Sequence, residues 1–223
     1  MRHFILPILI TWMSAAACFA AEESGISLRF LAERTPSNLG DVVLAVGDKL
    51  SPAFALSSDN LSDPIAVAAR KLALRLKEKP VVLAEISLPE NGNAFIVLLI
   101  PTSKGGYHPV VINSADVNFK GGDVYFYNHA NKPVLGHVGS AKFILKPGEG
   151  KLLHPAGAKE ETYYDVGFGV REEEGDRVLR SLRWPVATRS RSYVFFYQNP
   201  ENHRIDFRAV DEFVAPADPP KSP

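Results

Sequence analysis

The sequence predicts an all-β protein: one domain over residues 21–213, built as an antiparallel β-sandwich. Two observations favour this fold class. About eleven or twelve short runs of strand-forming residues follow one another with turn residues between them, and the 17 prolines and 16 glycines of the 223-residue chain supply those turns. The runs do not alternate with long amphipathic helical patterns, which would indicate a parallel α/β sheet. A sandwich or barrel of short strands accounts for both observations.

Residues 119–155 show the strand pattern most clearly. Short apolar runs alternate there with the turn sequences Gly-Gly, Asn-His-Ala-Asn-Lys, Gly-Ser and Lys-Pro-Gly-Glu-Gly. Turn chemistry at such short intervals is typical of antiparallel hairpins. The segments on either side repeat this rhythm, so we take it as the pattern of the whole domain.

The strand pattern is weaker before residue 81 than after it. Residues 26–33 alternate apolar and polar side chains, as a half-buried strand does, and 42–46 and 53–56 are further candidates. Residues 94–100 are apolar throughout, which predicts a central strand covered on both faces. The strands expected after residue 81 are 82–88, 94–100, 107–112, 123–128, 133–138, 142–145, 151–154, 163–171, 178–184, 192–198 and 204–213.

Residues 63–79 fit two structures. Asp63 as N-cap and Pro64 as the first helical residue would begin a helix with one apolar stripe. Within 70–76, however, leucines stand at alternate positions, which favours a strand. We expect the strand, because the neighbouring segments are strands, and keep the helix as the alternative.

The first twenty residues predict a secretory signal peptide. A basic residue, Arg2, precedes a short apolar run that ends in small residues, and we place cleavage after Ala20. The alternative of a membrane anchor is disfavoured, because the run is shorter than the roughly 20 residues that span a bilayer. Cys18, the only cysteine, permits a third interpretation, a lipoprotein acylated at that residue. The predicted localisation is therefore secreted or periplasmic.

The charge balance and the cysteine content argue against nucleic-acid partners and against disulfide bonds. Without Arg2 the mature chain would carry 24 basic and 25 acidic residues, a net charge of −1. Such a balance offers no strong field for nucleic acid, which we exclude as a partner. The mature chain would also have no disulfide, so its stability must come from core burial and β-ladders. Residues 214–223 are proline-rich and predict a disordered tail.

Five aromatic residues are candidate ligand-binding side chains. Exposed tyrosine or tryptophan on a sandwich face can stack on sugar rings, which would make the protein a carbohydrate-binding accessory domain. Aromatic residues also favour strands and cores for packing reasons alone, and we prefer that interpretation. The candidates are Tyr125, Tyr127, Trp184, Tyr193 and Tyr197.

Three histidines are candidate metal ligands. His129, His137 and His154 lie on successive predicted strands or at their ends, where antiparallel pairing could bring two together. Imidazole suits Cu(II) or Zn(II). Their spacing matches no metal-binding motif, so we predict no cofactor and keep a histidine-ligated copper or zinc protein as an alternative.

Part of the central segment resembles the cupredoxins. The run is Gly-Asp-Val at 122–124, Phe126, Asn128 and His-Val at 137–138, similar to the G-D-x-V-x-F-x-N…H-x-V run of that family. In that family the histidine is a copper ligand. Blue copper also requires a thiolate, and the mature chain has no cysteine. The resemblance therefore implies a cupredoxin-like or immunoglobulin-like sandwich without that copper chemistry.

A broader resemblance is to uncharacterised secreted bacterial β-sandwich proteins. It is carried by Leu145 with Pro-Gly-Glu at 147–149, by the late Trp184, and by Arg191 before the aromatic strand 193–197. No established activity comes with that group. It implies only the fold and the compartment.

No catalytic pattern is present in the sequence. It contains no G-x-S-x-G elbow, no H-E-x-x-H and no P-loop. The arginines of 177–191 follow the acidic run 172–174, and we interpret them as solvated and salt-linked, with an anion site as the alternative. The predicted function is thus a non-catalytic secreted or periplasmic binding or structural module, whose partner is an envelope protein or a glycan.

Overall fold

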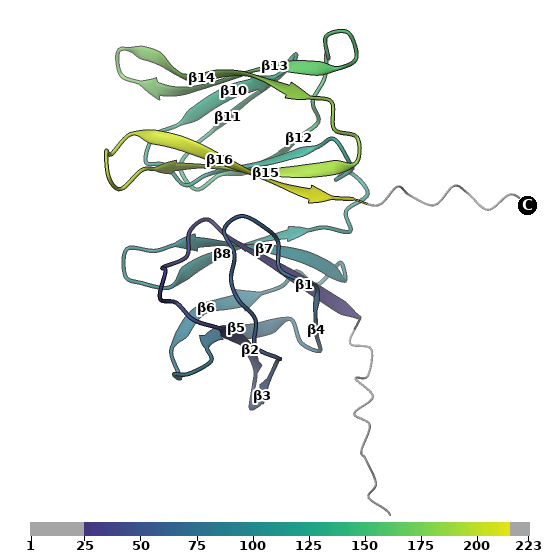
Figure 1. The fold of residues 1–223 in the computed structure, drawn as a ribbon, viewed down its shortest axis with the longest axis vertical. Coiled ribbons are helices and arrows are strands. Elements are labelled where there is room, and N and C mark those ends of the chain that lie inside the picture. Colours follow the sequence, from purple (N-terminus) through teal and green to yellow (C-terminus); the bar gives the residue numbers. More distant parts are fainter. Residues whose placement is uncertain (1–24, 215–223) are drawn as a thin grey trace, which may run out of the picture.

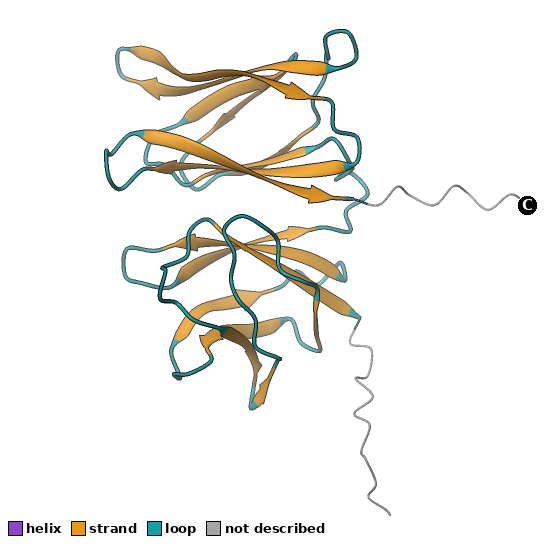
Figure 2. Cartoon of the chain, in the orientation of Figure 1, coloured by secondary structure: helices purple, strands orange, loops and turns teal. Residues whose placement is uncertain are grey.

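The structure is a computed structural model of the chain, and it describes residues 25–214. These residues form sixteen strands and no helix, so the predicted all-β class is confirmed (Figure 2). In this part of the chain nothing helical is long and apolar enough to cross a membrane. The predicted signal peptide, with Cys18 and the cleavage site after Ala20, lies outside the described residues, as does the tail from residue 215.

The strands follow one another along the whole described chain (Figure 1). They are β1 (Ile26–Ala32), β2 (Val42–Val46), β3 (Lys49–Leu50), β4 (Ile65–Val67), β5 (Lys71–Leu76), β6 (Val82–Ser87), β7 (Ala94–Pro101), β8 (Tyr107–Asn113), β9 (Val124–Asn128), β10 (Val134–Val138), β11 (Ala141–Leu145), β12 (Gly150–Leu153), β13 (Tyr163–Glu172), β14 (Gly175–Pro185), β15 (Ser190–Gln198) and β16 (Ile205–Phe213).

The ambiguous segment 63–79 forms strands. Ile65–Val67 is β4, which pairs with β1, and Lys71–Leu76 is β5. Leu72 and Leu74 point into the core, as their alternation predicted. The possible helix start at Asp63 is overridden because the strand pairs and buries these leucines, which a weak capping preference cannot outweigh.

The strands form four sheets of four strands each, which pack as two sandwiches. Sheet A (β4-β1-β7-β8) and sheet B (β3-β2-β5-β6) enclose the first core, which includes Leu28, Phe30 and Leu74. Sheet C (β12-β9-β15-β16) and sheet D (β11-β10-β13-β14) enclose the second, which includes Phe126 and Phe168. Figure 1 shows the two sandwiches one above the other.

The second sandwich repeats the topology of the first. Each pair of neighbouring strands between β1 and β8 recurs, eight strands later, between β9 and β16. The repeat includes one parallel pair in each otherwise antiparallel sandwich, β1 with β7 and β9 with β15. Both pairs join strands far apart in the chain, so no tight hairpin holds them antiparallel. Both sandwiches also carry a register shift in the same hairpin, β5–β6 and β13–β14.

A third apolar layer joins the two sandwiches. The outer face of sheet A packs there on the outer face of sheet C, through Leu31 and Leu98 on one side and Tyr193 and Phe195 on the other. Strand β7 is therefore covered on both faces, as its continuous apolar run predicted. Burying one large apolar side chain contributes about 1.5–3 kcal/mol, so this layer holds the sandwiches together.

Buried charges cross the same layer. Glu212 of β16, 8% exposed, accepts hydrogen bonds from Arg29 Nη1 of β1 at 2.8 Å and from the Tyr193 hydroxyl at 2.7 Å. Burial, together with the neighbouring Glu212 carboxylate, raises the pKa of Tyr193. Arg191 Nε lies 3.3 Å from Glu212 without hydrogen-bond geometry, and its Nη1 instead donates to the Phe119 carbonyl at 3.2 Å.

Candidate functional site: the sheet D groove

The stacking leaves the outer face of sheet D uncovered by another sheet (Figure 1). Strand register aligns one residue from each of its strands in a row on that face: Ile144, Leu135, Gly169 and Val178. Ile144 is 53% exposed and Val178 72% exposed, so the row ends in large apolar side chains open to solvent. We call it the apolar row.

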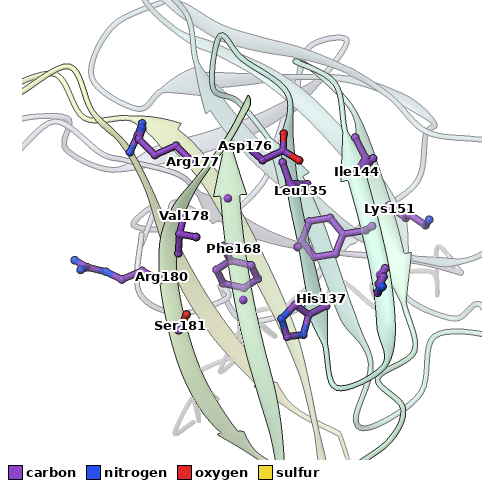
Figure 3. Close-up of a pocket in the computed structure, with 15 residues that line it drawn as sticks. Leu135, His137, Ile144, Lys151, Phe168, Asp176, Arg177, Val178, Arg180 and Ser181 are labelled. Carbon is purple, nitrogen blue, oxygen red and sulfur yellow. The ribbon is translucent and has the colours of Figure 1, made fainter. Parts of the chain in front are cut away.

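Gly169 makes a hollow in the apolar row. Strands lie about 4.8 Å apart, so the strands of Leu135 and Val178 are roughly 10 Å apart with no side chain between them. The resulting groove has a volume of ≈ 790 Å³ (Figure 3). A Cβ at residue 169 would lie 3.1 Å from the Arg177 carbonyl oxygen and 3.7 Å from Leu135 Cγ, so even a methyl group would begin to fill it.

A β-bulge shapes the wall of the groove. The register of β13 and β14 shifts between Phe168 and Gly169, because Phe168 pairs with Arg180 and Gly169 with Val178. A bulge adds an unpaired residue to one strand and re-aims the side chains beside it. The additional residue is Leu179, which packs toward the core while Val178 and Arg180 remain exposed.

A polar row lies beside the apolar row. It contains Lys142, His137, Gly167 and Ser181, again aligned by register. The His137 ring lies over Gly167, since a Cβ there would come 2.5 Å from its Nε2. Its Nδ1 is 3.1 Å from the Gly139 carbonyl oxygen. A carbonyl only accepts, so Nδ1 carries the proton and Nε2 is left for the groove side.

The rim of the groove is basic. Lys142, Lys151, Arg177 and Arg180 line it together with one acid, Asp176. Asp176 is bound by Arg171 Nε at 2.9 Å, and Arg177 Nε is bound to Glu172 at 3.2 Å. None of the ion pairs formed within residues 25–214 uses Lys142, Lys151 or Arg180. The groove therefore carries positive charge that no neighbouring acid compensates.

A second hollow adjoins the polar end of the groove at His137 and Ser181, and Asp165 lines it. Asp165 forms ion pairs with Lys159 and, at 3.7 Å, with Arg183. The hydrogen bond from Lys159 lowers the pKa of Asp165, so this carboxylate is ionised at neutral pH. It is already paired and leaves the free cations of the rim unneutralised.

The predicted aromatic candidates lie in packing positions. Tyr193 is 0% exposed and Tyr127 is buried with it between sheets A and C, where Tyr125 also packs. Trp184 packs edge-to-face on Phe168, with ring centroids 5.6 Å apart. Tyr197 is half-buried, and burial raises its pKa. The buried tyrosines form no exposed platform, because the second sandwich uses that face of sheet C to bind the first.

The three histidines have three separate environments. His129 Nδ1 is hydrogen-bonded to the carboxylate of the buried Glu33, and His154 Nδ1 lies 2.8 Å from Asp123 Oδ1. Only His137 lines the groove. Among the described residues no group of three or more histidine, cysteine or acidic side chains could hold a metal ion.

The residues of the apolar row were not predicted from the sequence, although the sequence contains a sign of the groove. It names His137, and it does not name Leu135, Ile144, Gly169 or Val178. The sequence shows glycines at 167 and 169 on the polar side of a strand, where side chains are expected. Glycine in a strand interior often marks a bulge or close approach of a ligand.

Comparisons with known proteins identify no family. No protein-family model matches the chain, and no curated protein matches it. Nine chains of solved structures match, and one of them is a family CBM26 module from Eubacterium rectale Amy13K in complex with maltoheptaose. It is 6% identical, covers 86% of this chain and 98% of its own, and has a TM-score of 0.25. A score this low carries no argument about fold or function.

Proposed function

We propose that the protein is a non-catalytic, secreted or periplasmic binding module whose ligand occupies the sheet D groove. The observation that carries this proposal is the apolar row, in which Gly169 opens a hollow between exposed aliphatic side chains. Apolar side chains gathered on a surface commonly mark an interaction site. The groove also falls within the range of small-ligand sites, about 300–1,000 Å³.

A binding role fits the groove better than catalysis. His137 Nδ1 is bound to a backbone carbonyl, whereas a catalytic histidine is commonly oriented by a carboxylate. The remaining polar groups of the groove are cations, the Ser181 hydroxyl and Asp176, whose carboxylate Arg171 already binds. Such groups orient a ligand. The signal-peptide pattern of residues 1–20 supports delivery to the envelope.

The test uses the neutral fluorescent probe N-phenyl-1-naphthylamine with residues 21–223. We expect saturable binding, and a loss of at least tenfold in affinity when the apolar row is charged in the variant Ile144→Glu/Val178→Glu. The matched control is Val117→Glu, an 80% exposed valine outside the groove, which should bind as the wild type does. Both mutated positions are exposed, so far-UV circular dichroism should show a retained fold. Equal binding by all three proteins would reject the groove as the site.

A further inference from the structure

We infer that the ligand of the sheet D groove is a single-chain aliphatic carboxylate, with its alkyl tail on the apolar row and its carboxylate among Lys142, Arg180 and Lys151. This inference rests on the proposed function and names the ligand class of the same site. It follows from three features: the aliphatic lining, the spacing of the two rows and the uncompensated cations.

The lining favours an alkyl tail over a sugar ring. The side chains that border the hollow at Gly169 are the aliphatic Leu135 and Val178, and Ile144 continues the row beyond Leu135. Phe143 and Phe168 lie beneath the same hollow, but their rings belong to the second core. Sugar binding relies on exposed aromatic faces, and the aligned rows of this groove contain none. An alkyl chain needs only apolar surface.

The spacing of the rows fits a ligand with charged and apolar parts joined directly. The polar row stands two residues along β10, β11 and β13 from the apolar row, which is about 7 Å. On β14 it stands three residues away because of the bulge. A tail lying over Gly169 therefore places its head over Gly167, beside His137. Lys142 of edge strand β11 and Arg180 of edge strand β14 flank that position from the two sides of the sheet. Figure 3 shows His137 and Ser181 at one end of the groove and Asp176 at the other.

The charges favour an anionic head. The chain has equal numbers of basic and acidic residues, yet Lys142, Lys151 and Arg180 have no acidic partner among residues 25–214. The nearby acids are engaged elsewhere, Asp176 by Arg171 and Glu172 by Arg177 and Lys132. A carboxylate accepts charge-assisted hydrogen bonds from both lysine and arginine. A cationic head would instead meet like charges.

The test compares three ligands with the same ten-carbon chain by isothermal titration calorimetry, all below their micelle concentrations. They are decanoate, decanol and decyltrimethylammonium. We expect decanoate to bind residues 21–223 at least tenfold more tightly than either of the others. In the variant Lys142→Glu/Arg180→Glu the preference between decanoate and decyltrimethylammonium should reverse. Lys104→Glu, in the exposed β7–β8 loop, is the matched control and should behave as the wild type.

The outcomes separate this inference from the proposed function. Equal affinities for the three ligands, or no measurable decanoate binding, would overturn the carboxylate assignment. Whether the groove binds a ligand at all would then still be decided by the binding of N-phenyl-1-naphthylamine, and by the loss of that binding in Ile144→Glu/Val178→Glu. Tighter binding of hexaglutamate than of decanoate would also overturn the inference and assign the groove to an acidic peptide.

Discussion

The two sandwiches share one topology but build it from different side chains. In the first, the core is mainly aliphatic, and Phe30–Phe54 is a close ring pair in it. In the second, Phe168 packs on several aromatic rings, among them Phe196 and Phe207. The strand order therefore depends on the in–out alternation of apolar residues and on turn positions, and not on which apolar residue fills each site.

The outer faces differ more than the cores. The central strand β5 of sheet B carries Ala73 and Arg75 on the face where β13 of sheet D carries Gly167 and Gly169. Ala73 lies between Ala45 and Glu85 in the register of sheet B. The same topology therefore has a filled face in sheet B and a hollow in sheet D. Both hairpins carry the bulge, so glycine in the central strand is what distinguishes the two faces.

The largest expected effect is the loss of stability when a large side chain is removed from either core. Phe168→Ala should cost about 3–5 kcal/mol of unfolding free energy, because it removes a buried ring from an aromatic cluster. Leu74→Ala in the first core should cost about 2–5 kcal/mol. Urea unfolding of residues 21–223 measures both. Trp184 is the only tryptophan after Trp12, so its fluorescence reports the second sandwich while far-UV circular dichroism reports both.

The same experiment tests whether residues 21–213 act as one domain. Because the apolar layer between sheets A and C is continuous with both sandwiches, we expect one transition, with Leu74→Ala shifting the Trp184 signal as well. A Leu74→Ala transition seen by circular dichroism but not by fluorescence would mean that the sandwiches unfold independently.

The next effect concerns the buried charges in the apolar layer between the two sandwiches. Glu212→Ala should cost about 3 kcal/mol, since it leaves Arg29 and the Tyr193 hydroxyl without their acceptor at a buried site. Tyr193→Phe keeps the ion pair and removes one hydrogen bond, so it should cost only about 1 kcal/mol. Chemical denaturation ranks the two variants. Equal costs would show that the ion pair contributes nothing in that layer.

The sequence predicts these strands well because alternation is local. It does not reveal that sheet C is covered by sheet A, since Tyr125, Tyr127 and Tyr193 would alternate in the same way on an exposed face. It does not reveal the repeated topology either, because the two sandwiches share the same order of strand pairing but not a similar amino-acid sequence. The groove needs four strands in register, and the shift between Phe168 and Gly169 moves that register by one residue.

A smaller effect tests why only sheet D is hollow. Gly169→Ala should change stability by no more than about 1 kcal/mol, since alanine favours a strand slightly more than glycine but its Cβ would lie 3.1 Å from the Arg177 carbonyl. Its affinity for N-phenyl-1-naphthylamine should nevertheless fall severalfold, because the methyl group enters the groove. The variant Ala73→Gly, at the sheet B position that matches Gly167, should add no second probe site. Unchanged affinity in Gly169→Ala would place the ligand elsewhere.

The smallest expected effect is a difference between the two sandwiches in how stability depends on pH. Hydrogen bonds from Arg171 lower the pKa of Asp176, and those from Lys132 and Arg177 lower the pKa of Glu172, both in the second sandwich. A carboxyl whose pKa is lower in the folded state stabilises it above the unfolded pKa of about 4, and this contribution is lost as pH falls through the folded value. Asp176→Asn should therefore flatten slightly the fall in melting temperature between pH 5 and pH 3, about the range in which such carboxyls titrate. Because Asp176 is exposed, solvent screens the pair and the difference should be small.

Asp41→Asn, which removes the 3.6 Å pair of Asp41 with Lys77 in the first sandwich, is the matched control. Comparing the two variants separates the loss of the bidentate contact of Arg171 with Asp176 from the loss of an exposed carboxylate in general. A steeper fall in Asp176→Asn than in the wild type would contradict the direction of the shift.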